Sequence, residues 1–439
     1  MVRKLYCTLF LLFSISYSCL GDVSFEVNGV LYSINSTGLT VDGLKDKTTP
    51  VDLKIPETIT YNTRTLKVTE FAFNAFEDCT GLRSISIPAS IKKFIGKADS
   101  WNSNDRYGKY NYDKCNCFKK CSNLKKVIFE DSEDELQLPA MNIDYHGSSP
   151  SYGLFSDAKI EELYIGRNLS LIYKKFNYTI TKADPFSGNP IKKVTIGKYV
   201  RYLDKYLLCG LEDLEQIHIP SNVKTIESSA FYYCTGLKKV TLEEGLEEIG
   251  DNAFGGCTSL QEINLPGSLK VIGDMAFWAC LELSSQIVIS NNIEKIDGGC
   301  FLSCTKIKSV FIGKNVKQIM NKAFDGCYSL TEVVSFIRDP QQCNIIENAF
   351  TSNTYASGIL YVPQGCVDSY KRSKQWNNFF NIQEYHGSIP QELSISPIVT
   401  DEKGYIKRIY DIQGRRLEKL RKGINLILTT DGIKKIIVN

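Results

Sequence analysis

A motif of about 23 residues recurs along this chain, and it strongly limits the folds open to the sequence. Residues 253–277 read AFGGCTSLQEINLPGSLKVIGDMAF, so the stretch ends on the Ala-Phe pair with which it began. The full motif is A-F-x-x-C-x-x-L-x-x-I-x-I-P, followed by a second apolar pair. One such unit cannot bury its apolar side chains alone and must stack on copies of itself. The repeat therefore predicts a solenoid.

Each motif has one anchor residue, which is almost always Phe. From Leu208 to Phe324 the anchors follow one another at steps of 23, 23, 23, 24 and 23 residues. The anchors are Phe76, Phe118, Phe155, Phe186, Leu208, Phe231, Phe254, Phe277, Phe301, Phe324 and Phe350. Two longer steps hold insertions, near 96–114 and at 131–153. Insertions in a solenoid emerge as loops, often on the binding face.

The residues of one unit predict one coil. Ile263 and Leu265 have the two-residue spacing of a strand, and Pro266 cannot continue a ladder and ends it. Phe254 and Cys257 are expected to point inward from the next corner. Stacked strands lie about 4.8 Å apart. We expect a mostly β solenoid of about eleven coils of roughly 23 residues each.

The repeated motif resembles the BspA-like leucine-rich repeat of bacterial surface proteins, over roughly residues 60 to 385. The resemblance implies a curved, right-handed coil. Residues 55–76 resemble the family's usual N-terminal start of the array, and residues 360–382 resemble its closing segment, with Trp376 and Phe379 sealing the last coil. We expect an N-terminal β cap over 22–60 and a solenoid over 61–385 that includes the exit cap.

The tail, residues 390–439, leaves the repeat pattern. Residues 409–417 predict two strands around a Gly turn, and T-T-D-G at 429–432 predicts a hairpin. The tail resembles the small C-terminal β-domains that type IX secretion uses as sorting signals. We expect a small all-β domain here.

The N-terminus has the pattern of a secretory signal over residues 1–21: two basic residues, an apolar run and then small residues. Two alternatives stay open at its end, lipidation of Cys19 as an anchor or cleavage after Ser18 or Gly21. No later stretch is long enough to span a bilayer. The net charge of +3 is too small to suggest a nucleic-acid partner.

The chain has 15 cysteines, and most follow from the repeat. Five occupy one motif position and predict a ladder of small buried thiols: Cys234, Cys257, Cys280, Cys304 and Cys327. A zinc site from Cys115, Cys117, Cys121 and His146 matches no known ligand spacing. Cys343 and Cys366 are the candidates for a disulfide after export.

The sequence does not favour catalysis or a cofactor. It has three histidines and no H-E-x-x-H, G-x-S-x-G or P-loop motif. We therefore expect a protein that is not an enzyme and holds no metal.

Two surfaces are candidates for binding. Along the strand face the outward position varies from polar to apolar, and it includes Tyr164, His218 and Phe311 together with Val288 and Val334. Strand propensity alone also favours such residues. The first insertion carries aromatic residues among Asn, Ser, Asp and Gly, a composition typical of binding loops. These residues are Trp101, Tyr107, Tyr110 and Tyr112.

Taken together, these features predict an exported protein of the bacterial surface that binds a host or matrix protein or a glycan without catalysis. The family resemblance implies adhesion, whereas the residues alone imply an extended binding surface. A structural spacer in a surface assembly is the alternative. A glycan-handling enzyme ranks third.

Overall fold

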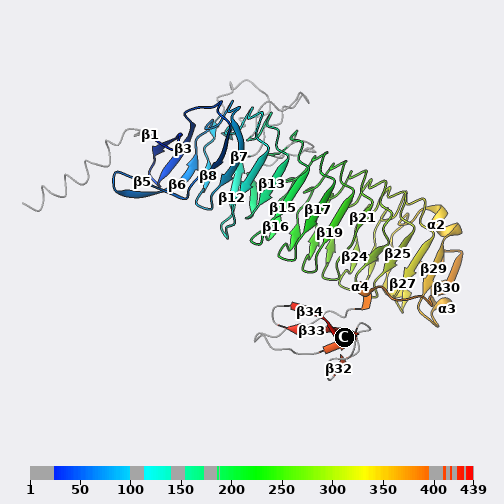
Figure 1. Ribbon diagram of the computed structural model, residues 1–439. Coiled ribbons are helices and arrows are strands. Elements are labelled where there is room, and N and C mark those ends of the chain that lie inside the picture. The colour runs from blue at the N-terminus through cyan, green and yellow to red at the C-terminus, as the bar shows by residue number, and fades with distance from the viewer. Residues whose placement is uncertain are drawn as a thin grey trace, which may run out of the picture. The chain divides into compact units, whose positions relative to one another are not determined.

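The computed structural model describes residues 24–98, 113–139, 154–172, 185–186 and 188–394, and the strands of the C-terminal tail. The chain divides into two compact units, residues 1–191 and 192–439. In each unit short strands lie side by side in coil after coil (Figure 1). The expected signal segment, with Cys19, lies outside the described residues.

The first unit starts with a sheet in the order β1-β2-β3-β6-β5, of mixed direction. Parallel strands β4, β7, β11 and β13 then form the first coils. The strands are β1 (Ser24–Val27), β2 (Val30–Ile34), β3 (Leu39–Leu44), β4 (Val51–Lys54), β5 (Thr58–Tyr61), β6 (Arg64–Phe71), β7 (Leu82–Ile87), β8 (Lys93–Phe94), β9 (Lys97–Ala98), β10 (Asp113–Lys114), β11 (Lys126–Phe129), β12 (Leu136–Pro139), β13 (Glu162–Ile165) and β14 (Leu169–Ile172).

The second unit places two strands in most coils. The major sheets, β17-β19-β21 and β23-β25-β27-β29-β30, carry the I-x-I part of the motif. Their strands are β15 (Lys193–Ile196), β17 (Gln216–Ile219), β19 (Lys239–Leu242), β21 (Glu262–Ile263), β23 (Ile287–Ile289), β25 (Ser309–Ile312), β27 (Glu332–Ser335), β29 (Ile359–Val362) and β30 (Asn381–Glu384), where β15 precedes β17 along the chain.

The minor sheets, β16-β18-β20-β22 and β24-β26-β28, carry the second apolar pair. Their strands are β16 (Tyr202–Leu203), β18 (Thr225–Ile226), β20 (Glu248–Ile249), β22 (Val271–Ile272), β24 (Lys295–Ile296), β26 (Gln318–Ile319) and β28 (Asn344–Ile345). Pairing is parallel, and the register equals the repeat, as in Gln216 opposite Lys239. The sequence period is therefore the length of one coil.

The anchor phenylalanines form the core. Consecutive rings stack with centroids 5.0 to 5.4 Å apart, close to the spacing of neighbouring strands. All anchors, Leu208 included, are buried. The inward orientation expected for Phe254 and Cys257 is confirmed, because neither side chain is exposed to solvent.

The cysteine ladder is also present, and its thiols have hydrogen-bond partners. The Sγ of Cys257 donates to the carbonyl oxygen of Phe231 at 3.2 Å, and that of Cys280 donates to Phe254 at 3.3 Å. Each thiol thus contacts the anchor of the preceding coil. Cys343 and Cys366, the disulfide candidates, are both free thiols.

Strand β25 ends where the preceding coil approaches closely. A Cβ on Gly313 would lie 2.6 Å from the carbonyl oxygen of Ser290 in the preceding coil, so only glycine fits after β25. Two residues per corner also adopt positive φ, for example Met275 at 53° and Ala279 at 55°. Their N–H groups donate to the next coil, to Gly298 and Leu302, at 2.9 and 2.8 Å. Stacking therefore holds a backbone conformation that these residues would otherwise avoid.

Short helices end the array: η1 (Pro340–Gln342), α2 (Ser352–Ser357), α3 (Val367–Arg372) and α4 (Gln391–Ser394). Trp376 and Phe379 are buried beside the last coil, and the ring of Phe379 lies 5.4 Å from that of Phe350. In the tail, four strands form an antiparallel sheet in the order β32-β31-β33-β34. They are β31 (Ile409–Asp411), β32 (Arg416–Leu417), β33 (Gly423–Thr429) and β34 (Gly432–Val438).

Candidate binding surfaces

The outward residues of the major sheets change character along the second unit. His218, Thr241 and Asn264 occupy this position in β17, β19 and the residue after β21. Further along, Val288, Phe311 and Val334 pair in register in β23, β25 and β27, and Tyr361 follows in β29. The same column is therefore polar in the earlier coils and apolar near the exit cap.

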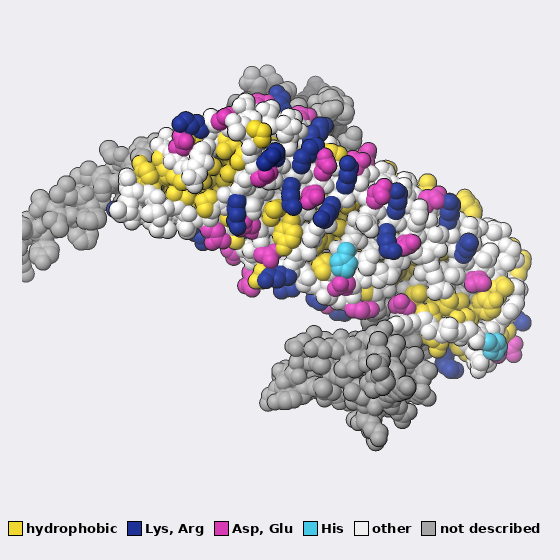
Figure 2. Space-filling model, viewed as in Figure 1, with side chains coloured by type: hydrophobic (Ala, Val, Ile, Leu, Met, Phe, Trp, Pro, Cys, Tyr) yellow, Lys and Arg dark blue, Asp and Glu magenta, His cyan; other side chains and the backbone are white. Residues whose placement is uncertain are grey.

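Ion pairs between neighbouring coils lie beside the polar part of this column. Lys239 and Glu262 approach to 2.6 Å, and Lys238 and Glu215 to 2.8 Å. Acidic and basic side chains alternate over this face in Figure 2. Such exposed pairs each contribute at most about 1 kcal/mol. They make this part of the face hydrated and electrically balanced.

Near the exit cap the face carries an aromatic surface, which we call the exit patch. It consists of Phe336, Tyr361 and Tyr385, all partly exposed, and hydrophobic side chains gather there in Figure 2. The Tyr385 ring lies edge-on to Phe336, at 5.6 Å, and to Tyr361, at 6.0 Å. Its hydroxyl donates to the carbonyl oxygen of Ser388 at 2.8 Å. The rings are therefore held in fixed positions.

Phe311 corrects one expectation from the sequence. We expected it, with Val288 and Val334, to be exposed on the strand face, but all three are buried, and Phe311 is 5% exposed. They do point out of the sheet, but the exit patch and Leu393 of α4 pack over them. The Asn291 side-chain amide donates to the Leu393 carbonyl oxygen at 2.7 Å and fixes that contact. A second apolar layer on the outer face was not visible in the repeat pattern.

Tyr164 and His218 lie at outward positions of the strand face, as expected. The Tyr164 hydroxyl donates to Asp131 at 2.7 Å, and this carboxylate raises the pKa of Tyr164 to about 12. His218 is exposed, with its Nε2 3.1 Å from a carboxylate oxygen of Glu243. Tyr164 belongs to the first unit and His218 to the second. The aromatic residues of the insertion, Trp101, Tyr107, Tyr110 and Tyr112, lie outside the described residues.

Sequence reasoning missed the three residues of the exit patch. Tyr361 had a signal, because L-Y-V-P at 360–363 repeats the end of the strand motif and places Tyr361 opposite Val334. Phe336 follows Val334 at strand spacing, just beyond the end of the repeated motif. Tyr385 had no signal, since it follows the closing strand β30 and lies outside the repeated motif.

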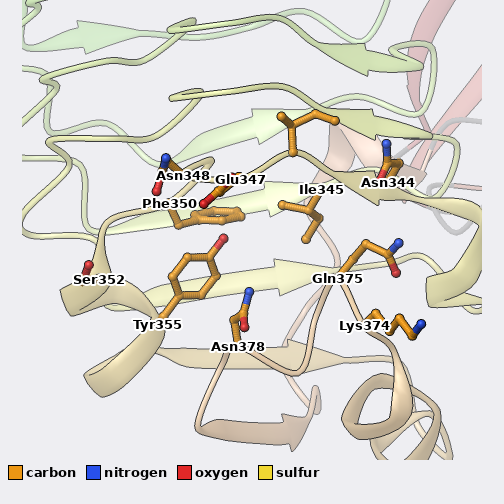
Figure 3. A pocket seen from close by; sticks show the side chains of 11 residues that line it. Asn344, Ile345, Glu347, Asn348, Phe350, Ser352, Tyr355, Lys374, Gln375 and Asn378 are labelled. Atoms are coloured by element: carbon orange, nitrogen blue, oxygen red, sulfur yellow. The ribbon is translucent and has the colours of Figure 1, made fainter.

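A cavity of about 400 Å³ lies at the exit end of the second unit (Figure 3). Its walls combine amide side chains with two aromatic rings, and its lining includes Asn344, Asn348, Phe350, Tyr355 and Asn378. Burial raises the pKa of Tyr355 to about 12, opposed by a hydrogen bond from the Phe350 backbone. No motif in the sequence indicated this cavity.

Among the described residues, no group of three or more His, Cys, Asp or Glu side chains is placed to hold a metal ion. Within the same residues, no helix is long and apolar enough to cross a membrane. What the described surface offers is a hydrated face, an aromatic patch and a polar cavity.

A scan against protein families matches the BspA-type leucine-rich repeat region, in six copies over residues 57–175, 142–250, 179–288 and 224–357. The chain belongs to this family. The match agrees with the parallel registers and the anchor ladder described above. The BspA-type leucine-rich repeat thus accounts for most of the chain. A search of curated proteins finds no significant match.

Several solved structures show a distant likeness to this chain. The pneumococcal vaccine antigen PcpA is 23% identical, over 83% of this chain and 99% of its own, with a TM-score of 0.37. A leucine-rich repeat protein from Bacteroides ovatus is 19% identical, over 77% and 100%, with a TM-score of 0.32. A leucine-rich cell surface protein from Faecalibacterium prausnitzii is 15% identical, over 72% and 95%, with a TM-score of 0.28.

Proposed function

We propose that this BspA-type protein is exported to the bacterial surface and binds a host or matrix protein there, without catalysis, through the strand face of its second unit. A glycan ligand is the alternative within the same function. The signal-like segment at 1–21 supports export.

The observation that carries the proposal is the exit patch. Aromatic residues are enriched at the centres of protein interfaces and supply most of the binding energy there. Phe336, Tyr361 and Tyr385 are held by mutual ring contacts and by a buried layer beneath, so little conformational entropy remains to be lost on binding. The neighbouring polar column offers the hydrated rim that such interfaces have.

The proposal predicts that binding depends on the patch. The mature chain is screened against arrays of immobilised matrix proteins and glycans, and affinities for each hit are then measured for three variants. Phe336→Ala and Tyr361→Ala each lose about 2 kcal/mol or more, near thirtyfold in affinity. Thr241→Ala is the matched control, because it lies in the same column away from the patch, and it binds like the wild type.

All three variants must melt alike for the comparison to hold. Tyr361→Phe keeps the ring and retains most of the affinity, which separates loss of contact area from loss of folding. If Phe336→Ala and Tyr361→Ala bind every hit as well as Thr241→Ala does, the exit patch is not the site. The insertion with Trp101 and Tyr110 then becomes the next candidate, through the same pair of measurements.

A further inference from the structure

The last coil leaves one sheet edge open. The major sheet continues past β27 into β29 and β30, but the minor sheet ends at β28, which pairs with β26 alone among the described strands. An unpaired strand edge presents N–H and C=O groups to any chain that can add to it. The cavity at the exit end lies at this edge, because Asn344 and Ile345 of β28 line it.

The preceding coil shows which groups a further coil would satisfy. The N–H groups of Lys322 and Phe324 donate forward, to the carbonyl oxygens of Asn348 at 3.1 Å and Ala349 at 2.7 Å. The carbonyl oxygens of Lys317 and Ile319 accept from the N–H groups of Asn344 and Ile346, both at 2.8 Å. Each coil thus presents two donors and two acceptors to its successor at these positions.

In the last coil no further strand of the minor sheet follows to bond the equivalent groups. The register of β26 with β28 identifies two of these groups as the carbonyl oxygens of Cys343 and Ile345. The stacking of Phe324 on Phe350 identifies the other two as the N–H groups of Asn348 and Phe350. The Tyr355 hydroxyl oxygen accepts a hydrogen bond from the Phe350 N–H. The other three find no hydrogen-bond partner among the described residues.

The N–H of Ile345 also faces the cavity. Main-chain groups alternate in direction along a strand, and the N–H groups on either side of Ile345, those of Asn344 and Ile346, donate to the preceding coil. Both main-chain groups of Ile345 therefore point away from β26. The unpaired groups are thus both main-chain groups of Ile345, the N–H of Asn348 and the carbonyl oxygen of Cys343. These are the donors and acceptors that an open strand edge presents.

Residues of the closing segments line the cavity opposite this edge. Figure 3 shows Ile345 and Phe350 on one side of the cavity, with Tyr355, Gln375 and Asn378 facing them from α2 and the closing loop. The side-chain amides of Asn344, Asn348 and Asn378 have no hydrogen-bond partner among the described residues. Amides of this kind pair with peptide groups, since they offer both a donor and an acceptor.

We propose that this cavity binds a partner's extended peptide segment, which adds one strand to the minor sheet at β28. Main-chain hydrogen bonds to Ile345 and Asn348 give affinity, and the rings of Phe350 and Tyr355, which line the cavity in edge-on contact with one another, offer an apolar surface to one side chain of the segment. The volume of about 400 Å³ lies in the lower part of the range of known ligand sites. This site is separate from the exit patch, since the two share no residue.

The test uses the mature chain and a randomised heptapeptide library displayed on phage. Enriched peptides are synthesised and titrated against two variants. Ile345→Pro removes the edge N–H, which is not part of the bonds to β26, and weakens binding at least about tenfold. Ile345→Val keeps the N–H and binds within about twofold. Tyr361→Ala in the exit patch leaves peptide affinity unchanged, so failure of this proposal and failure of the proposed function can be told apart.

N-methylation of the peptide keeps the proposal testable even where Ile345→Pro disturbs folding. Each peptide is N-methylated at one residue at a time and titrated against the unmodified protein. Loss of affinity at alternate residues is expected, because alternate N–H groups of an added strand face the edge. The proposal is overturned if no peptide is enriched over the Ile345→Pro protein, or if N-methylation weakens binding at no position. It is also overturned if neutral oligosaccharides bind the cavity and displace the peptides.

Discussion

At the scale of the residue, the core repeats one arrangement: an anchor ring stacked on the ring before it, and a thiol bonded to the carbonyl oxygen of the preceding anchor. Both follow from the parallel stacking, which places identical positions about 5 Å apart. The burial of thiols in this core makes the folding stability depend on pH. Burial raises the pKa of two ladder thiols, Cys280 and Cys327, well above the usual value for a thiol, and it does the same for Cys300, a buried thiol at the Ala position of the motif.

These thiols predict that the protein loses stability in alkali. Above about pH 8.5 the unfolded chain releases their protons and the folded chain keeps them, so stability falls as pH rises. By about pH 9.5 each of the three contributes a loss on the order of 1 kcal/mol, and a few kcal/mol together, while tyrosines are still largely protonated. Urea unfolding between about pH 7.5 and pH 9.5 measures the loss.

The control for the alkaline loss is the triple variant Cys280→Ala, Cys300→Ala, Cys327→Ala, whose stability changes less over the same interval. Equal pH dependence in both proteins would show that these thiols ionise alike in the folded and unfolded states. Thiol titration of denatured, unreduced protein supplies a second check, because free ladder cysteines react and disulfide-bonded ones do not.

At the scale of the element, short strands are joined by corners whose backbone is strained. Met275 and Ala279 hold positive φ because their N–H groups bond to the next coil. Related coils place Gly256 and Gly326 where Ala279 stands, and both also have positive φ. A residue with a Cβ in this conformation costs about 1–2 kcal/mol.

This strain predicts that Ala279→Gly does not destabilise the protein. The relief of about 1–2 kcal/mol exceeds the added entropy of the unfolded chain, about 0.4–1 kcal/mol, and leaves a net gain of up to about 1 kcal/mol. Ala276→Gly is the matched control, because Ala276 is buried in the same corner without positive φ. It destabilises by about 1 kcal/mol. Thermal unfolding compares the two, and equal losses would contradict the strain.

The sequence predicted the elements of the array better than its surfaces. The period of 23 residues gave the strand registers, the anchor ladder and the buried thiols, because each depends on one coil contacting the next. It did not give the buried state of Phe311 or the cavity beside β28. Both arise where the repeat stops, since Tyr385, Leu393 and the 374–378 loop come from the closing segments. The roles of Trp101, Tyr107, Tyr110 and Tyr112 stay predictions.

At the scale of the whole molecule, the two units are stacks in which long-range order comes from contacts between neighbouring coils. Both binding proposals concern the exit end of the second unit, where the regular stacking gives way to the closing helices and strands. The domain limits at 22–60, 61–385 and 390–439 stay predictions. The claim on which the rest depends is that each repeat is held by its neighbours alone.

Removing one coil tests that claim most directly. Deletion of residues 254–276 takes out one period and joins Ala253 to Phe277, so that the ring of Phe277 meets that of Phe231 across the new junction. The account predicts a folded protein with the same fraction of strand by circular dichroism, cooperative unfolding and unchanged binding at the exit end. Loss of cooperative unfolding together with loss of strand content would contradict it.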